Sequence, residues 1–426
     1  GKSAMPFDER VPKGWARVCL SDVAERFLNG GTPSTEEPPF WNGSIPWITG
    51  ADFEDQKAIL GRRYITPAAV AASATNIIPK GHLLIVTRTG VGKIAQAPCD
   101  VAISQDITGM IVKEEYDCRF LYWQLNRLAG KLQRRIQGTS INGLLREDLE
   151  SFPIPVPSLA EQIRIARILD GLDTVISRTR AVIEQTRRLK TALLQNLLTN
   201  GLPGMHRGFR KHPALGRIPH CWKCLSIDEL ATKDPRSIQS GPFGSSLLHS
   251  EFGSEGVLVI GIDNVLDGRF SIGAEHRIRP EKFNELKKYQ ARPSDVLITV
   301  MATVGRCCVV PENLEPALIT KHVYRIAVDQ SLCLPDFLMW NVLANPHVSR
   351  QLYGNAQGQT RDGLNGQSIR RLRIPIPPLE EQRVIVRTVD AIQGREDQES
   401  KNLNQLSIVK SGLSAALLDG RIRVRR

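Results

Sequence analysis

Two stretches of the chain carry apolar residues at the spacing of a long amphipathic helix. From Ile165 to Leu193 these residues recur at steps of three and four, a spacing that predicts a coiled-coil seam. The second stretch keeps the pattern from Ile385 but is polar between Gln393 and Asn402. We expect the following residues to pack in the seam or against a partner protein: Ile165, Ile168, Leu172, Val175, Val182, Leu189 and Leu193 in the first stretch, and Ile385, Ile392, Leu406, Val409 and Leu413 in the second.

The two stretches are copies of one unit, 220 positions apart. Ile154-Pro-Val-Pro157 leads into Glu161-Gln162, and Ile374-Pro-Ile-Pro377 leads into Glu381-Gln382. Because proline is excluded from a helix interior, each helix is expected to begin just after its prolines, over residues 158–200 and 378–420. If the helices pair antiparallel, the polar window of the second lies across from Arg178 and Arg180. Self-similarity of this length indicates that the chain arose by duplication.

A longer region precedes each helix. Val11-Pro-Lys-Gly-Trp15 opens the first and Ile218-Pro-His-Cys-Trp222 opens the second. Both regions are rich in glycine, proline and threonine, with short β-branched runs that predict strands between turns. The sequence therefore predicts an α+β protein with one domain at 5–157 and a similar one at 218–377, besides the two helices. A basic linker at 201–217 and a basic tail at 421–426 complete the expected organisation.

Charge narrows the choice of partner. The 426 residues carry a formal net charge of +12, which favours a polyanionic partner such as nucleic acid. No run of eighteen apolar residues occurs, so we expect a cytoplasmic protein without a membrane partner. The eight cysteines do not read as a disulfide framework in a chain of this size.

Several motifs in the chain partly match catalytic or metal-binding patterns. Cys221 and Cys224 have the spacing of half a zinc site, but no second ligand pair follows, so ordinary thiols and no metal are expected. Gly90-Val-Gly-Lys93 lacks the spacing and the hydroxyl residue of a phosphate-binding loop. Glu37-Pro-Pro-Phe40 has glutamate where an adenine methyltransferase would have asparagine or aspartate. We therefore expect no catalytic residues in this chain.

Glycine-containing polar segments recur in both regions, and they are the candidates for binding DNA. A strand that runs into a glycine turn followed by a cation lets the backbone approach a phosphate, and polar side chains on such turns can read base edges. Ordinary hairpin turns explain the same glycines equally well. The candidate DNA-binding residues are Thr32, Ser34, Arg88, Lys93, Ser104 and Gln105 in the first domain, and Ser240, Ser245, Ser246, Arg306 and Lys321 in the second.

The arrangement of these motifs resembles one known family. Two variable α+β regions, each opened by Pro-x-x-Trp and closed by Ile-Pro-x-Pro-x-Leu-x-Glu-Gln on a long helix, are similar to the specificity subunit (HsdS) of type I restriction-modification systems. The helix ends, Leu189 to Leu194 and Val409 to Leu413, resemble that family too. The likeness covers nearly the whole chain, although the second helix is unusually polar in its middle.

The resemblance implies a fold and a function. The two helices would form an antiparallel coiled coil that holds two target-recognition domains apart about a pseudo-two-fold axis. Each domain would read one half of a split, asymmetric sequence in double-stranded DNA, and helix length would set the gap. The family's S subunit binds two modification subunits, and restriction subunits in some assemblies. S-adenosylmethionine, ATP and magnesium would be used by those partners, and this chain would hold no cofactor.

Two other classes of function stay open on the sequence alone. The chain could be a protein-binding scaffold with no DNA role, in which the long helices matter most. It could also be a fragment of a DNA methyltransferase or nuclease, although no glycine-rich loop for S-adenosylmethionine follows a strand. Binding to DNA separates the first alternative from the specificity role, and cofactor binding separates the second.

Overall fold

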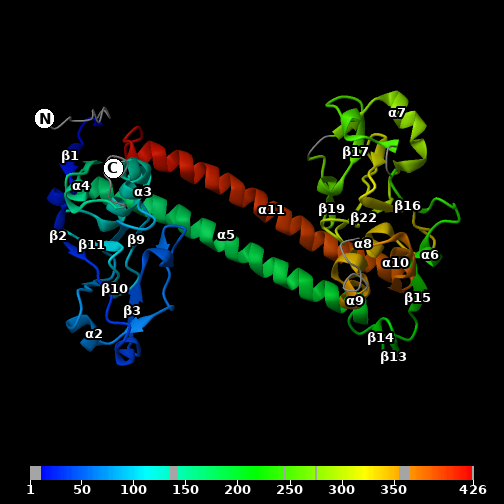
Figure 1. The fold of residues 1–426 in the computed structure, drawn as a ribbon, viewed down its shortest axis with the longest axis horizontal. Coiled ribbons are helices and arrows are strands. Elements are labelled where there is room, and N and C mark those ends of the chain that lie inside the picture. The colour runs from blue at the N-terminus through cyan, green and yellow to red at the C-terminus, as the bar shows by residue number, and fades with distance from the viewer. Residues whose placement is uncertain (1–10, 135–142, 244–245, 274–275, 355–363, 425–426) are drawn as a thin grey trace. The chain divides into compact units, whose positions relative to one another are not determined.

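The computed structural model describes residues 11–134, 143–243, 246–273, 276–354 and 364–424 (Figure 1). The chain divides into two compact units, one formed by residues 1–180 with 401–426 and the other by residues 181–400. Each unit contains a mixed α/β domain and parts of two long helices, α5 (Leu159–Asn200) and α11 (Leu379–Leu418). The predicted α+β class with two similar domains and two long helices is confirmed.

The domain of the first unit is built on two four-stranded sheets. The sheets have the strand orders β2-β11-β8-β9 and β6-β3-β10-β7, and two small sheets, β1-β12 and β4-β5, accompany them. The elements are β1 (Ala16–Cys19), α1 (Leu20–Val23), β2 (Ala24–Asn29), β3 (Ile45–Ile48), β4 (Phe53–Glu54), β5 (Lys57–Ala58), β6 (Tyr64–Ile65), α2 (Pro67–Ala71), β7 (Ile77–Ile78), β8 (Leu83–Val86), β9 (Ile94–Gln96), β10 (Val101–Ile103), β11 (Ile107–Val112), α3 (Cys118–Arg134), α4 (Arg146–Glu150) and β12 (Pro153–Val156).

Strand β8 shows why the domain is layered. All four of its residues are buried, because its sheet is covered on both faces. Leu83 and Ile85 pack with α3 and the start of α5, whereas Leu84 and Val86 pack toward the second sheet. A strand buried on both sides reads as a continuous apolar run rather than an alternating one.

The domain of the second unit repeats this plan. Its sheets have the orders β16-β25-β22-β23 and β20-β17-β24-β21, position for position those of the first domain. The elements are β13 (Phe209–His212), β14 (Gly216–Pro219), β15 (Lys223–Ser226), α6 (Ile227–Leu230), β16 (Ile238–Ser240), β17 (Val257–Ile260), β18 (Val265–Leu266), β19 (Arg269–Phe270), β20 (His276–Ile278), α7 (Pro280–Glu285), β21 (Gln290–Ala291), β22 (Val296–Thr299), β23 (Cys307–Val309), β24 (Ala317–Ile319), β25 (Val323–Ile326), α8 (Pro335–Ala344), α9 (Pro346–Gly354), α10 (Gly366–Arg371) and β26 (Arg373–Ile376).

The glutamine of each Glu-Gln motif fastens a long helix to its domain. Gln162 is buried; its amide donates to the Pro157 carbonyl at 2.9 Å and accepts from the Asp117 N–H at 2.9 Å. Gln382 makes the matching bonds to the Pro377 carbonyl and the Leu334 N–H, each at 2.9 Å. A buried side-chain amide that satisfies the backbone on two sides fixes where the helix begins.

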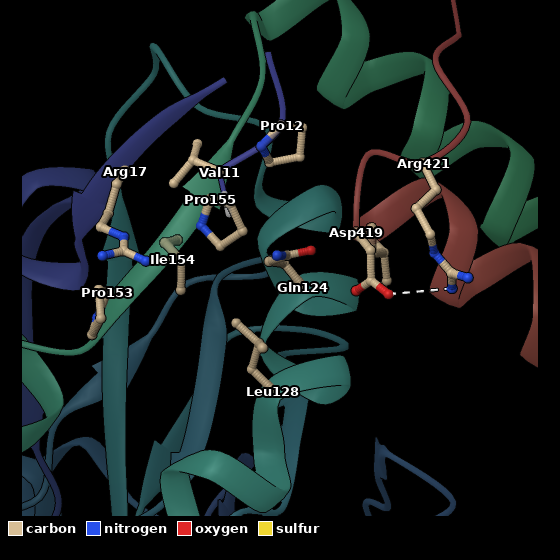
Figure 2. Close-up of a pocket in the computed structure, with 11 residues that line it drawn as sticks. Val11, Pro12, Arg17, Gln124, Leu128, Pro153, Ile154, Pro155, Asp419 and Arg421 are labelled. Atoms are coloured by element: carbon tan, nitrogen blue, oxygen red, sulfur yellow. Dashed lines mark hydrogen bonds and ion pairs between the residues drawn. The ribbon is translucent and has the colours of Figure 1, made fainter. Parts of the chain in front are cut away.

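The glutamate of the first motif binds the C-terminal tail. Glu161 is buried and accepts two hydrogen bonds from the Arg423 guanidinium, at 2.8 and 2.7 Å. These bonds lower the pKa of the Glu161 carboxyl, even though burial opposes the shift. Nearby, Asp419 and Arg421 line a cavity of about 210 Å³ with Gln124 of α3 (Figure 2). The tail that was predicted only as a basic segment therefore closes the first unit.

The glutamate of the second motif, Glu381, also binds a segment that follows a long helix, but its partner is a histidine instead of an arginine. One oxygen of Glu381 contacts His206 Nε2 at 2.7 Å and accepts from the Leu202 N–H at 3.1 Å. Its other oxygen accepts from the Trp222 indole at 3.1 Å. The segment after α5 thus docks on the second unit as the segment after α11 docks on the first.

The residues predicted for the seam or for a partner surface divide into a buried or half-buried set and an exposed set. Ile165 is buried and Ile168, Leu172 and Leu193 are half-buried, and the positions one residue after three of the predicted ones, Leu169, Ile176 and Ile183, are buried as well. Val175, Val182, Leu189 and Val409 are exposed, so of the two predicted roles only the partner surface is open to them. In α11, Ile385, Ile392, Leu406 and Leu413 lie in the seam. A spacing of three and four residues fits both the predicted positions and those one residue later. The contact between the helices also includes polar residues, which a search for apolar spacing does not find.

The polar window of α11 lies within the seam and pairs with other cations than expected. Glu396 is buried and binds Lys190 at 2.7 Å and Arg187 at 2.6 Å, not Arg178 or Arg180. Burial alone would raise the pKa of the Glu396 carboxyl, but the two cations hold it below its ordinary value. In the first unit, Lys410 binds Asp173 of α5 at 2.7 Å. In each unit, therefore, the segments of α5 and α11 pair antiparallel around a polar contact.

The region predicted as a basic linker is a folded hairpin for much of its length. Strands β13 and β14 pair antiparallel from Phe209–Pro219 to His212–Gly216. The Arg217 guanidinium lies over the Phe209 ring at 4.1 Å, and Arg210 donates to the Trp222 carbonyl at 2.8 Å. Two basic side chains of this region are thus engaged within the second unit, whereas Arg207 and Lys211 are exposed.

Arg423→Ala is expected to lower the free energy of unfolding by about 3 kcal/mol at pH 7, because it leaves the buried Glu161 carboxylate without its cation. Urea unfolding of the full chain followed by circular dichroism measures this. Arg421→Ala, which removes an exposed ion pair with Asp419 in the same tail, is the control and should cost less than about 1 kcal/mol.

The same pair predicts a dependence on pH. Since the pKa of Glu161 is lowered in the folded state, its contribution is complete above the unfolded pKa of about 4.3 and is lost as the pH falls further. The difference between wild type and Arg423→Ala should therefore shrink below that pH. A difference that stays constant from pH 7 to pH 3 would contradict the assignment.

Candidate nucleic-acid interface

The first domain brings four strand ends to one edge. Ile107 at the start of β11 pairs with Val86 at the end of β8, and Thr108 pairs with Asn29 at the end of β2. In the second sheet β10 and β3 are parallel and end together at Ile103 and Ile48. The segments that follow these strands are therefore neighbours.

Hydrogen bonds join these segments to one another. The Gly31 N–H donates to the Ile103 carbonyl at 2.9 Å, and the Ser104 N–H donates to the Ile48 carbonyl at 3.0 Å. Lys93 Nζ donates to the Gly50 carbonyl at 3.3 Å, which ties the turn after β8 to the turn after β3. The turns that carry the candidate residues, together with the Thr49–Asp52 turn, form one continuous rim, called here the first edge, made of residues 30–34, 49–52, 87–93 and 104–106.

Most candidate residues of the first edge are exposed. Thr32 donates a hydrogen bond to the Gln105 amide oxygen, so these two lie together. Ser34, Arg88 and Lys93 are also exposed. Ser104 is the exception: it is 1% exposed, and its hydroxyl accepts from the Asp106 N–H at 3.3 Å. Ser104 therefore shapes the turn and is not placed to touch a ligand, contrary to the prediction.

The second domain forms an equivalent rim. Tyr324 of β25 pairs with Ser240 at the end of β16 and with Ile298 of β22, while β17 and β24 end together at Ile260 and Ile319. The Gly241 N–H donates to the Thr320 carbonyl at 3.2 Å, and the Thr320 N–H donates to the Ile260 carbonyl at 2.9 Å. Residues 240–243 with 246, 261–264, 300–306 and 320–322 are called here the second edge.

The candidate DNA-binding residues on the second edge differ in how exposed they are. Lys321 and Ser246 are exposed, and Arg306 is half-buried. Ser240 is 9% exposed and its hydroxyl donates to the Gly241 carbonyl at 3.3 Å, so it too supports the turn. Ser245 lies outside the described residues.

Exposed cations lie on both edges, and the second edge also carries the exposed carboxylate of Asp263. Within the described part of the chain, Arg88 and Lys93 on the first edge and Lys321 on the second form no ion pair with an acidic side chain. Asp52 on the first edge is buried and paired with Arg62 at 3.2 Å. Burial, and then the charge of Lys321, lower the pKa of His322, so this side chain is neutral at pH 7.

The end of a helix borders each edge, which the sequence reading missed. Gln133 of α3 donates to the Val91 carbonyl at 2.8 Å, and Tyr353 of α9 reaches the Val304 carbonyl at 3.5 Å. The Leu144 N–H donates to the Thr87 carbonyl at 2.7 Å, and the Leu364 N–H donates to the Val300 carbonyl at 3.1 Å. Leu144 and Leu364 are 220 positions apart, so the repeat itself was the signal that could have identified them.

The cysteines near the start of the second domain lie in separate pairs with histidines. Cys221 Sγ is 3.4 Å from His206 Nδ1, and Cys224 Sγ is 4.0 Å from His212 Nδ1. Among the described residues no three histidine, cysteine or acidic side chains gather as a metal site. Within the same part of the chain, no helix is long and apolar enough to cross a membrane.

Comparison with known proteins points to a single family. A model of the type I restriction modification DNA specificity domain matches residues 12–185 and 258–407. The MjaVIII specificity subunit of Methanocaldococcus jannaschii is 24% identical over 423 residues, covering 98% of this chain and 95% of that protein. The EcoBI specificity subunit of Escherichia coli is 25% identical over 334 residues, covering 76% and 67%. The crystal structure of a type I S subunit from M. genitalium has a TM-score of 0.61 at 14% identity, covering 97% and 98%.

Gly241→Ala is expected to lower stability by about 2 kcal/mol and to displace the second edge, because a Cβ atom at this position would lie 2.1 Å from the Ile319 carbonyl oxygen. Thermal unfolding with amide exchange at Thr320 tests both effects. Gly253→Ala is the control, since a Cβ there meets nothing within 4 Å. Equal stability of the two variants would show that residue 241 does not need the close approach.

Proposed function

The chain belongs to the type I restriction-modification DNA specificity family, and we propose that its first and second edges each read one half of a bipartite, asymmetric target in double-stranded DNA. The observation that carries this proposal is the repeated rim: four strand-end segments meet in each domain through matching hydrogen bonds. Loops on a rigid sheet edge are where binding residues gather, and exposed cations there can bind phosphates.

The long helices supply the surface for partner subunits in this proposal. Val175, Val182, Leu189, Ile408 and Val409 are apolar, yet at least a third of each is exposed on α5 or α11. Exposed apolar positions that repeat along a helix are typical of a second packing face. Two modification subunits would bind there, and restriction subunits would join the assembly through them.

The chain is proposed to act without chemistry of its own. The modification subunits would bring S-adenosylmethionine for adenine methylation, and restriction subunits would bring ATP and magnesium. The assembled complex would work in the cytoplasm, where the DNA is. Binding of S-adenosylmethionine by the isolated chain, measured by calorimetry, would overturn this division of labour and favour the methyltransferase alternative.

Mapping adenine methylation tests the function directly. The chain is co-expressed with its modification partner in a methylation-free host, and methylated adenines are mapped by single-molecule sequencing. A split motif with two fixed halves and a constant gap, lost when this chain is deleted, is the expected result. A stable complex that methylates no defined motif would instead support the protein-scaffold alternative.

Arg88→Ala and Arg306→Ala are each expected to weaken binding of the complex to its target by about three- to tenfold, and to reduce the slope of log affinity against log salt by about one. Both changes remove a cation that the structure places on an edge. Fluorescence anisotropy over a range of salt concentrations measures affinity and slope together.

The matched controls remove exposed cations from the opposite ends of the same sheets. Lys80 precedes β8 and Arg292 precedes β22, so neither lies on an edge. Lys80→Ala and Arg292→Ala should leave affinity and slope unchanged. If both edge variants behave like their controls, the loops after β8 and β22 do not contact DNA.

A further inference from the structure

A hairpin in the first domain reaches from the first edge to the helix pair. Strands β4 and β5 follow directly after the Thr49–Asp52 turn of that edge. The two residues between them, Asp55 and Gln56, have φ of 44° and 64°, the left-handed conformation of a tight two-residue turn. This turn points to α5. It contacts the helix at a place separate from the apolar core that the domain shares with the start of α5.

The hairpin is firmly held on its domain side. The Ile59 N–H donates to the Asp52 carbonyl at 2.8 Å, and the Tyr122 hydroxyl donates to the Gln56 carbonyl at 3.1 Å. Movement of the hairpin therefore carries the Thr49–Asp52 turn with it. The same turn receives the bond from Lys93 described above.

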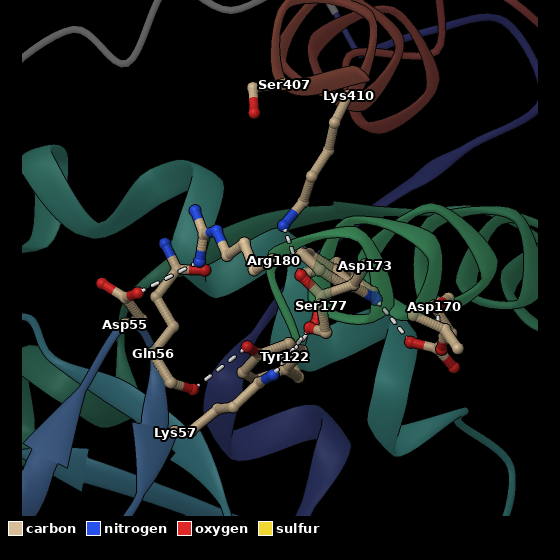
Figure 3. A network of polar contacts seen from close by, with 12 residues as sticks. Asp55, Gln56, Lys57, Tyr122, Asp170, Asp173, Ser177, Arg180, Ser407 and Lys410 are labelled. Atoms are coloured by element: carbon tan, nitrogen blue, oxygen red, sulfur yellow. Dashed lines mark hydrogen bonds and ion pairs between the residues drawn. The ribbon is translucent and has the colours of Figure 1, made fainter. Parts of the chain in front are cut away.

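On the helix side, polar side chains of the hairpin cross an open space. A crevice of about 700 Å³ lies between residues 54–57 and the helices. Lys57 crosses it to Asp173 at 3.4 Å and to the Ser177 hydroxyl at 3.5 Å, and Asp55 meets Arg180 at 3.3 Å (Figure 3). Asp173 also binds Lys410 of α11 at 2.7 Å, so one carboxylate joins the hairpin and both helices. Burial opposes ionisation of Asp173, but the two lysines lower its pKa and keep it charged.

These contacts give the first domain a second point of attachment. The first is the apolar core around Ile165, Ala166 and Leu169 near the start of α5. Arg180 lies eleven residues beyond Leu169, or about 16 Å along the helix axis. Two attachments separated along an axis resist rocking about either one. A movement of the edge by about 3.4 Å would equal one base-pair step.

We propose that Lys57 and Asp55, through Asp173 and Arg180, are positioning residues that fix the orientation of the first recognition domain on the helix pair and thereby restrict the gap accepted between the two half-sites. This inference rests on the proposed function. It concerns residues away from the first edge, which set geometry and do not touch bases.

The second domain provides an internal control. Its matching hairpin, β18–β19, turns inward: the Gly268 N–H donates to the Cys307 carbonyl at 2.9 Å, and a Cβ on Gly268 would lie 2.9 Å from the Trp340 ring. Arg269 holds the place that Lys57 has in the first hairpin. Among the described residues no ion pair joins this hairpin to α11, so the attachment is particular to the first domain.

The test uses the assembled complex and duplexes that carry the mapped target with its natural gap, or with one base pair removed or added. Lys57→Met combined with Arg180→Gln should reduce the preference for the natural gap by about fivefold, the scale of two partly exposed ion pairs. Asp173→Asn, which keeps the size of the side chain, should act in the same direction. Arg269→Met should retain the wild-type preference.

The outcomes separate the possible failures. An unchanged preference in both test variants overturns the inference and leaves the proposed function intact. Equal weakening at all three gaps also overturns it, because Lys57 and Arg180 would then be phosphate contacts. A wild-type complex without any gap preference overturns the two-half-site function and this inference together.

Discussion

Each compact unit depends on a buried glutamate side chain whose hydrogen bonds are completed by a segment that follows one of the long helices. Glu161 and Glu381 occupy the same position in the repeat, and both are almost fully buried. A buried charge without a partner is costly, so a donor must be brought to each site. Arg423 comes from the segment after α11 and His206 from the segment after α5. The requirement explains why the ends of the long helices fold back and why the first unit includes the C-terminus.

The parts of the fold that depend on local patterns could be predicted from the sequence. Prolines followed by Glu-Gln marked the helix starts, and apolar runs such as Leu83 to Val86 marked strands. The choice between seam residues could not be made in this way, because Leu169 and Ile168 both fit a spacing of three and four from Ile165. Lys190 and Glu396 occupy seam positions as an ion pair, which no apolar pattern identifies. The contact of Glu161 with Arg423 joins residues far apart in the chain, so local reasoning had no access to it.

The two edges, too, were predictable from local sequence patterns only in part. The polar candidates follow predicted strands, and strand pairing brings the turns that carry them together. Burial within a turn was not predictable, and it removes Ser104 from the set that can touch a ligand. The two rims also differ in chemistry. Thr32 and Gln105 offer a hydroxyl and an amide on the first, whereas Phe243 is 59% exposed on the second. Polar groups suit the edges of bases and apolar groups suit thymine methyls, so the side chains that the two rims offer differ in kind.

The polar contacts between the long helices restrict how they can slide past each other. Apolar seams tolerate a shift by one heptad, because any leucine can replace another. A shift would separate Lys190 from Glu396 in one unit and Lys410 from Asp173 in the other. Each separation leaves a charge partly buried without its partner, which is more costly than the pair itself is stabilising. Within each unit, the polar contact of that unit therefore opposes a slip of one helix segment past the other. The register that remains is the one in which each lysine of the repeat meets an acidic residue of the opposite helix.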